Sequence, residues 1–449
     1  MSDLLFQYER VNPTSWAYLS SLLTIALFFK FNRVFCMRNL DLLLVISLAP
    51  GLLCIEQALR GLGSESVEQF GYVWILAVNG LLLVRALADS AMVRRPLLDP
   101  NMTTGGLTFL SLALLAFLTA NVITGNPGQS DLVAVQRAEH LSHREASELE
   151  KNTLATHGPG FSFLFLLPHI STRALIDAPV DDAAAESQER IEELPDRPTN
   201  VLTARVMAIL CQAMIVLGML LIAHRHFDNV RLGIAAAAMY LLLPYTALWT
   251  GNVTHALPAA LLVWAVLFYR RPFVAGSLIG LGCGAIYYPF SLLPLWAAYY
   301  WQRGFVRFLS GVGITVAALI ATLIFTSTDA AMFFARLQQM LGLRLPPMEG
   351  LSGVWDFWNV WYRVPIIVAF FGLSLSFALW PVQKNLATLL SGSAALMLGV
   401  QFWHAHSGGL ALAWYLPLLL LMAFRPNLED RVASSLVIPS RWDNLKGAG

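Results

Sequence analysis

Apolar stretches of membrane-spanning length recur along the chain and constrain its fold more than any other feature. A helix needs roughly 17 to 25 apolar residues to cross about 30 Å of hydrocarbon. Hydrophobic residues make up 57% of the 449 and charged residues 13%, proportions outside the range of a soluble domain. The sequence therefore predicts an all-α polytopic transmembrane helical bundle of about 11–13 membrane segments. Thirteen stretches are candidates: 15–31, 40–56, 70–86, 106–123, 201–223, 232–250, 255–270, 273–286, 289–302, 308–326, 364–381, 386–402 and 409–424.

Two of these stretches, 273–286 and 289–302, are shorter than a full span and meet at Pro289. Proline interrupts a helix because it lacks an N–H group and its ring collides with the preceding turn. The pair is therefore interpreted either as one shallow hairpin or as two separate spans. The first apolar stretch follows Asp3 and Glu9 without a small-residue cleavage site, so we expect it to be retained as a span.

Lysine and arginine residues follow every second candidate span, and such a bias marks the cytoplasmic loops. The pattern predicts an N-terminus outside and a C-terminus inside. The retained spans and the lack of a targeting peptide favour a multi-pass protein of a bacterial inner membrane. The residues that carry the charge pattern are Lys30, Arg33, Arg38, Arg85, Arg94, Arg95, Arg225, Arg231, Arg270, Arg271, Arg303, Arg307, Lys384 and Arg425.

The same alternation places loop 124–200 on the outer face, where it holds thirteen Asp and Glu against six Lys and Arg. Within it, "DLVAVQRAEHLSHREASELEK" at 131–151 carries apolar residues at helical spacing, which predicts an amphipathic helix at the membrane surface. The acidic, proline-bounded stretch 178–198 is typical of a solvated insert. No basic cluster indicates a nucleic-acid partner, and the four cysteines contain no CxxC pair.

Three stretches carry a resemblance to a known superfamily. They are "THGPGFSFLFLLPHI" at 156–170, "HRHFDNVRLGIAAAAMYLLLPYTALWTGNVTHALPAALLVWAVLFYRR" at 224–271 and "PFVAGSLIGLGCGAIYYPFSLLPLWAAYYWQRG" at 272–304. Their order after a large outer loop resembles the polyprenyl-phosphate-sugar-dependent GT-C glycosyltransferases, which include protein mannosyltransferases and aminoarabinose transferases. The resemblance covers about residues 106–326. It suggests N-terminal membrane helices at 1–105, a GT-C-like core at 106–326 containing outer loop 124–200, and an outer interfacial loop, C-terminal helices and cytoplasmic tail at 327–449.

This resemblance implies an enzyme that moves a sugar from a polyprenyl-phosphate donor to a lipid, glycan or protein acceptor on the outer face. Its partners would be the polyprenyl-phosphate sugar lipid and membrane lipids, with no cofactor and with a divalent metal optional. The superfamily often shows an acidic pair early in the outer loop, whereas this chain offers Asp131 alone. Four apolar segments also precede the outer loop, which is three more than usual.

Transfer of a sugar requires a base for the acceptor proton and donors or cations for the departing phosphate. Asp131, held at the membrane surface facing the lipid headgroup, is the predicted base, and Glu139 is the reserve; Asp131 is alternatively an acid that complements its own helix dipole. The residues predicted to bind substrate are His157, Gly158, Gly160, His169, Arg173, His255, Tyr287, Tyr288, His404 and His406, and no residue is assigned to a metal.

Two other classes of function compete with this interpretation. A lipid or glycolipid transporter or flippase requires ionisable groups near the bilayer midplane or broken helices in symmetric halves. The apolar stretches of this sequence contain almost no charged residues. A transporter is therefore ranked second, after the glycosyltransferase. A non-catalytic membrane scaffold is the third possibility, favoured by the missing acidic pair.

Overall fold

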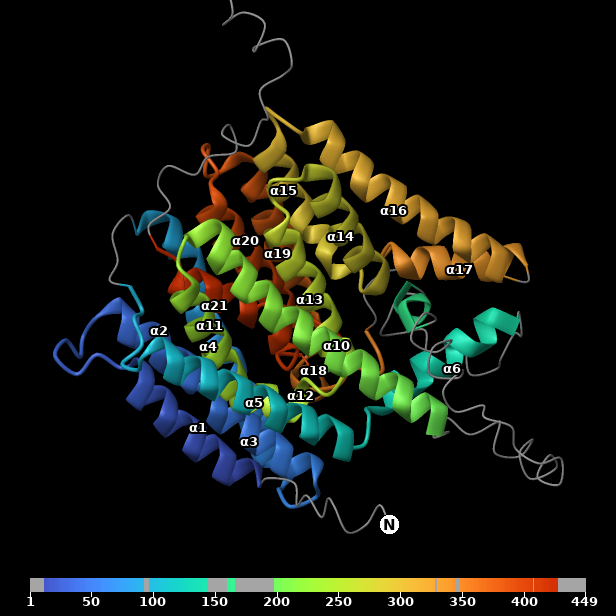
Figure 1. Cartoon of the computed structure of the whole chain (residues 1–449). Helices are drawn as coiled ribbons and strands as arrows, with labels where there is room; N and C mark the ends of the chain where they lie inside the picture. Colours follow the sequence, from blue (N-terminus) through green and yellow to red (C-terminus); the bar gives the residue numbers. More distant parts are fainter. Residues whose placement is uncertain are drawn as a thin grey trace, which may run out of the picture.

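The computed structural model describes residues 12–92, 97–143, 160–165, 198–327, 329–343, 348–406 and 408–426. These residues form a helical bundle (Figure 1), with one isolated bridge of the strand type between Gly353 and Gly408. The N-terminal half contains α1 (Pro13–Phe28), α2 (Met37–Ile46), α3 (Leu48–Leu59), α4 (Glu65–Ala88), η2 (Asp89–Ala91), α5 (Thr104–Thr124), α6 (Gln129–His143), α10 (Pro198–Ile222) and η4 (Ala223–Phe227).

The C-terminal half continues with α11 (Val230–Leu242), α12 (Pro244–Trp249), α13 (Val253–Leu267), α14 (Pro272–Ala285), η5 (Tyr288–Leu292), α15 (Leu293–Tyr300), α16 (Phe305–Thr326), α17 (Ala330–Met340), α18 (Val354–Phe357), η6 (Val360–Tyr362), α19 (Arg363–Leu379), α20 (Leu386–Val400), η7 (Leu412–Trp414) and α21 (Leu416–Phe424). Local sequence sets several of these boundaries. Asn229 and Asn385 accept hydrogen bonds from N–H groups in the first turns of α11 and α20, and Pro244 and Pro272 occupy first helical positions.

The predicted all-α class is confirmed in the described residues, where each of the thirteen apolar stretches falls on helical structure, and this is compatible with a helical membrane bundle. Six helices in the described part are long and apolar enough to cross a membrane: Met37–Leu59, Glu65–Ala91, Thr104–Thr124, Pro198–Phe227, Phe305–Ile324 and Val360–Leu379. Four further apolar helices are shorter, including α13 and α14. Prolines explain part of the shortening, since Pro244 separates α11 from α12 and Pro289 lies between α14 and α15.

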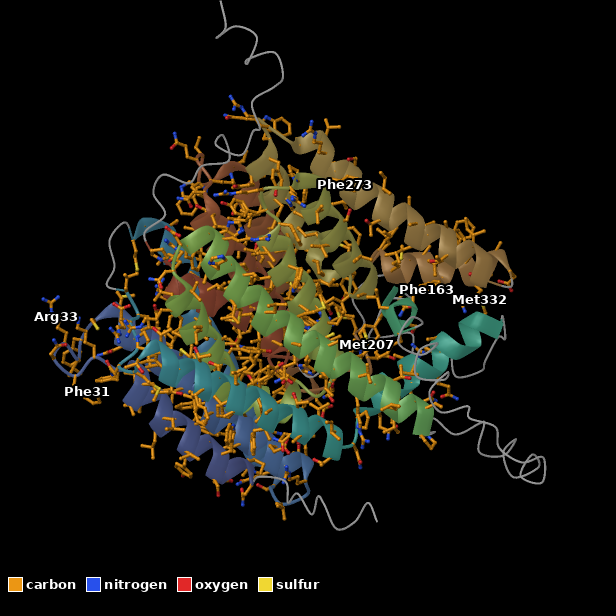
Figure 2. All side chains as sticks on the ribbon, in the orientation of Figure 1. Phe31, Arg33, Phe163, Met207, Phe273 and Met332 are labelled. Carbon is orange, nitrogen blue, oxygen red and sulfur yellow. The ribbon has the colours of Figure 1, made fainter. Side chains whose placement is uncertain are left out.

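Loops predicted to lie on the cytoplasmic side meet at one end of the bundle, here called the basic end and defined by Phe28, Arg38, Asp99 and Arg231. The Arg38 guanidinium donates to the backbone carbonyls of Phe28 and Asp99, and Arg231 donates to that of Pro100. Figure 2 shows Arg33 at this end and Phe163 at the opposite end, here called the α6 end. Alternation of the segments therefore brings the arginine-rich loops together, and the side of the membrane they face stays a prediction.

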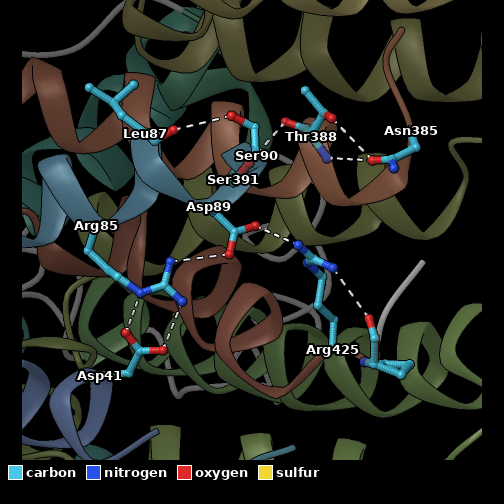
Figure 3. A network of polar contacts seen from close by, with 10 residues as sticks. Asp41, Arg85, Leu87, Asp89, Ser90, Asn385, Thr388, Ser391 and Arg425 are labelled. Atoms are coloured by element: carbon cyan, nitrogen blue, oxygen red, sulfur yellow. Dashed lines mark hydrogen bonds and ion pairs between the residues drawn. The ribbon is translucent and has the colours of Figure 1, made fainter. Parts of the chain in front are cut away.

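Four charged side chains form a buried network at the basic end (Figure 3). Arg85 of α4 donates to both carboxylate oxygens of Asp41 at 2.6 and 3.0 Å and to Asp89 at 3.2 Å. Asp89 also accepts from Arg425, just beyond α21, at 2.6 Å. The network thus ties the start of α2 and the end of α4 to the end of the last described helix. These four charged side chains can be buried because each has a partner of opposite charge.

Helices α14 and α16 pack at close backbone contact. A Cβ atom built on Gly276 would lie 2.2 Å from the carbonyl oxygen of Phe308, and one on Gly311 would lie 2.2 Å from that of Phe273. Small residues spaced four apart let helices approach this closely inside a membrane. The stretch 273–302 forms two antiparallel legs: Tyr300 at the end of α15 donates to the carbonyl of Tyr269, so both legs reach the basic end.

The described part of the acidic loop contains a helix, α6, where an amphipathic helix was predicted, and its apolar face is covered by protein. Helix α6 packs against α10 and α13, and Leu132, Val135 and Ala138 are buried inside the protein. Residues 144–159 and 166–197, which include the expected solvated insert, lie outside the described residues. Helix α17, from the outer interfacial loop predicted to begin at residue 327, lies near α6 at the same end of the bundle (Figure 1). The α6 end is therefore built from both predicted outer loops.

Candidate functional site

Asp131 occupies the first turn of α6 and is fully buried, whereas the sequence had suggested a carboxylate open to the membrane surface. Its Oδ2 atom accepts a hydrogen bond from the backbone N–H of Val253 at 2.7 Å, and the N–H of Thr254 also donates to the carboxylate. Val253 and Thr254 form the start of α13. Asn252, which precedes α13, makes no side-chain hydrogen bond to the first turn of that helix. Asp131 therefore caps α13 from a different helix, because unpaired N–H groups at a helix start attract a carboxylate.

The second carboxylate oxygen of Asp131 has no hydrogen-bond partner within the part of the chain that the structure describes. Burial raises the pKa of Asp131 from 3.8 to about 7, and the two N–H donors of α13 oppose part of that rise. A carboxyl group with a pKa near neutrality and one unoccupied oxygen has the protonation behaviour of a general base. It is also the behaviour of a buried structural acid, so the arrangement permits base chemistry without requiring it.

His255 follows directly after the two residues that bind Asp131. Its Nδ1 atom and the hydroxyl of Tyr245 share a hydrogen bond of 2.7 Å. The indole N–H of Trp414 donates to the backbone carbonyl of Thr254 at 3.1 Å, and the Trp414 ring lies 5.5 Å from Tyr288. The first turn of α13 thus connects Asp131 and His255 to an aromatic cluster at the α6 end.

That aromatic cluster contains four more of the predicted substrate-binding residues. The Tyr287 hydroxyl donates to that of Tyr288 at 2.9 Å, and the Tyr288 ring lies 5.0 Å from His404. His404 Nδ1 also contacts the backbone carbonyl of His406. Burial lowers the pKa of His406, and the charge of Arg363 lowers it further. A neutral imidazole and paired phenols can exchange hydrogen bonds with a polar ligand.

Two arginines from separate helices, Arg137 of α6 and Arg336 of α17, are close enough for the charge of one to affect the other. Arg137 lies on α6, and its Nε and Nη2 atoms are buried without a hydrogen-bond partner in the described part of the chain. Arg336 of α17 is 4% exposed, and burial together with the charge of Arg137 lowers its pKa. The sequence analysis did not single out Arg137. The sequence did contain a signal for Arg137: this arginine lies between Val135 and Ala138, two positions on the apolar face of the predicted amphipathic helix.

Gly160 is pressed against α14. A Cβ atom on Gly160 would lie 2.5 Å from the carbonyl oxygen of Gly284, and the following Phe161 and Phe165 are buried inside the protein. The described turn of this stretch therefore packs against the protein itself. His157, Gly158, His169 and Arg173 lie outside the described residues, as does the side chain of Glu139.

The structure thus brings Asp131, Gly160, His255, Tyr287, Tyr288, His404 and His406 to one end of the bundle. No group of three His, Cys, Asp or Glu side chains within the described residues is arranged to hold a metal ion. No protein-family model matches the chain, and neither the curated proteins nor the solved structures contain a match.

Proposed function

We propose that the protein is an integral membrane glycosyltransferase that moves a sugar from a polyprenyl-phosphate donor to a hydroxyl acceptor at the α6 end of the bundle. One observation carries the proposal: helix α6 holds both Asp131, with one buried carboxylate oxygen, and Arg137, with two buried guanidinium nitrogens, that have no hydrogen-bond partner among the described residues. Transfer from a phosphate needs these two chemistries within one site.

Arg137 and Arg336 supply the phosphate-binding part. The charge of Arg137 lowers the pKa of Arg336, so the two guanidinium groups repel each other, and a dianion bound near both would relieve that repulsion. Guanidinium groups bind phosphate through charge-assisted hydrogen bonds, often in pairs. The departing polyprenyl phosphate gains negative charge during transfer, so contacts at this position favour the transition state.

Asp131 supplies the base. The acceptor hydroxyl gives its proton to Asp131 while its oxygen bonds to the anomeric carbon of the sugar. The bond from that carbon to the phosphate oxygen breaks, and its electron pair leaves with the polyprenyl phosphate. Attack from the side opposite the phosphate inverts the anomeric centre. Because the free oxygen of Asp131 is covered, the residues around it must move when substrates bind, as conformational steps do in many enzymes.

The placement of charge argues against the transporter alternative. Within the described ranges, the buried Arg38, Arg85, Asp89 and Arg425 lie at the basic end, whereas the buried Asp131 and Arg336 lie at the α6 end. A transporter places its coupling groups near the middle of the bilayer. The described helices therefore place few charged side chains near the middle of the bundle, where a transporter would bind its ion or substrate.

Binding of polyprenyl phosphate tests the anion site without knowledge of the sugar. The full chain in nanodiscs is titrated with undecaprenyl phosphate and with undecaprenol, which lacks the phosphate. We expect the phosphate to bind more tightly, and Arg137→Gln to weaken it by about tenfold or more through loss of a charge-assisted bond. Arg307→Gln, at an exposed arginine of the basic end, serves as the matched control. Equal affinity for the two lipids would exclude this function.

The role of Asp131 is tested by release of polyprenyl phosphate from donors linked to mannose, glucose or aminoarabinose in a native membrane extract. Asp131→Asn keeps an oxygen that accepts from Val253 but removes the base, so release should stop while donor binding persists. Asp356→Asn, at an exposed acid of the same end, should retain full release. Unchanged release by Asp131→Asn would leave this residue as a helix cap without a catalytic role.

The proposal also requires the α6 end to face outward. Cysteines are placed at exposed positions of the two ends, Asp356→Cys and Gln302→Cys, after Cys36 and Cys54 are replaced by serine. An impermeant thiol reagent applied to intact cells should label the first cysteine and spare the second. The reverse result would place the site on the cytoplasmic side and contradict transfer on the outer face.

A further inference from the structure

A cavity lies at the α6 end, on the side of the bundle built by the N-terminal helices. Its volume is about 170 Å³, and it opens between α1, α3, α5, α10 and α12. Its lining includes Trp16, Asn121 and Gln212 together with an ion pair of 2.8 Å between Glu56 and Arg60. A space of this size holds more than a single water molecule.

Three buried polar atoms around this cavity lack hydrogen-bond partners within the described residues. They are the indole N–H of Trp16, the amide Nε2 of Gln212 and the amide Oδ1 of Asn121. Gln212 is 1% exposed and Trp16 is 9% exposed. Unpaired polar groups are costly in a protein interior, so three of them around one cavity indicate a polar occupant.

The mixture of donors and acceptors restricts the chemistry of that occupant. Trp16 and Gln212 require an acceptor, whereas Asn121 Oδ1 requires a donor, and a hydroxyl group supplies both. An anion without a proton, such as chloride or sulfate, would leave Asn121 Oδ1 unpaired, although Arg60 and Arg205 also line the cavity. An apolar chain would leave all three groups unpaired. The Trp16 ring, stacked on Phe117 at 5.1 Å, also provides the flat apolar surface that a sugar ring contacts.

We infer that this cavity is a carbohydrate-binding site for a single polyhydroxylated ring. Its position suggests the role of acceptor site, and that role rests on the proposed function. Asn252 lines the cavity and immediately precedes Val253, whose N–H binds Asp131. Gln212 also lines it, and the adjacent Cys211 lies close to Asp131. An acceptor sugar held here would be next to the base.

The site assigns a purpose to the helices that precede the superfamily-like region. Trp16 comes from α1, and Glu56 comes from α3, both within residues 1–105. These helices would form one wall of the acceptor site, while α5 and α10 form the other. The additional N-terminal segments would then set which sugar is accepted.

The test measures binding of three methyl glycosides, those of α-mannose, β-glucose and N-acetyl-β-glucosamine, to the full chain by saturation-transfer NMR. The protein is held in nanodiscs, because many detergents carry sugar headgroups, and the donor lipid is absent. We expect saturable binding of at least one glycoside. Gln212→Leu and Trp16→Phe, each of which removes an N–H donor, should weaken it by about tenfold. Trp16→Phe keeps an aromatic ring, so it is informative if Gln212→Leu does not fold.

Two matched controls come from exposed residues at the basic end, Gln302→Leu and Trp301→Phe, and both should bind as the unaltered chain does. Absence of saturable binding for all three glycosides would overturn the inference and indicate a cavity filled by water only. Binding that both site variants leave unchanged would overturn it as well. Asp131→Asn should bind the glycosides normally, so a failed transfer reaction and a failed carbohydrate site are distinguishable.

Discussion

The strongest quantitative expectation concerns the dependence of stability on pH at Asp131. The folded protein raises the pKa of this buried carboxyl from 3.8 to about 7. At 1.36 kcal/mol for each pKa unit, the ionised carboxylate costs the folded state about 4 kcal/mol at pH 8. As the pH falls through 7 the folded state binds a proton that the unfolded chain does not yet bind, so this penalty shrinks and nearly disappears at pH 4.

Asp131→Asn removes the ionisation and keeps an oxygen that accepts from Val253. The variant should therefore exceed the unaltered chain in unfolding free energy by up to about 4 kcal/mol at pH 8 and by less than about 1 kcal/mol at pH 4. Unfolding is followed by circular dichroism during titration with dodecyl sulfate in mixed micelles at both pH values. Other carboxyl groups titrate in both proteins and cancel in the comparison. An equal difference at the two pH values would refute the reasoning.

Three further predictions follow from other contacts. Asp89→Ala leaves Arg425 without its buried carboxylate and should lower the unfolding free energy by about 3–5 kcal/mol, whereas Glu56→Ala, at the partly exposed pair, should cost less than about 1 kcal/mol in the same titration. Gly276→Leu forces α14 away from α16 and should reduce the yield of folded protein; Gly313→Leu, where a Cβ meets nothing within 4 Å, should not, and equal yields would contradict the close packing. Transfer should accelerate as the pH rises through about 7, where Asp131 ionises, and a rate that falls over this interval would exclude it as the base.

Much of the helical architecture could be predicted from the sequence. Apolar stretches of sufficient length must form helices in a membrane, because the lipid offers no partner to backbone N–H and carbonyl groups. The thirteen stretches consequently coincide with helical elements, and the pair at 273–302 was recognised as irregular from Pro289 and its length. The distribution of arginines likewise predicted which loops meet at the basic end.

The surroundings of single side chains were harder to predict. Asp131 was identified as a candidate base, but its burial depends on the start of α13, which lies 122 positions further along the chain. Periodicity showed that α6 is amphipathic without showing whether its apolar face meets lipid or protein. The structure resolves this in favour of protein, since Leu132 and Val135 are buried. Arg137 escaped attention because an arginine near a membrane surface usually extends its charged end into water.

The sequence by itself determined that the chain forms a bundle of apolar helices with its arginine-rich loops on one side, since length, hydropathy and charge act locally and do not depend on partners. Only the tertiary structure decided which polar groups lie together: Asp131 binds the start of α13, Tyr288 packs beside His404, and Arg137 lies close enough to Arg336 to lower its pKa. These contacts join segments that are distant in sequence. They arise from the packing of helix faces, and side-chain volume and close backbone approach at small residues set that packing in ways that a one-dimensional pattern does not record.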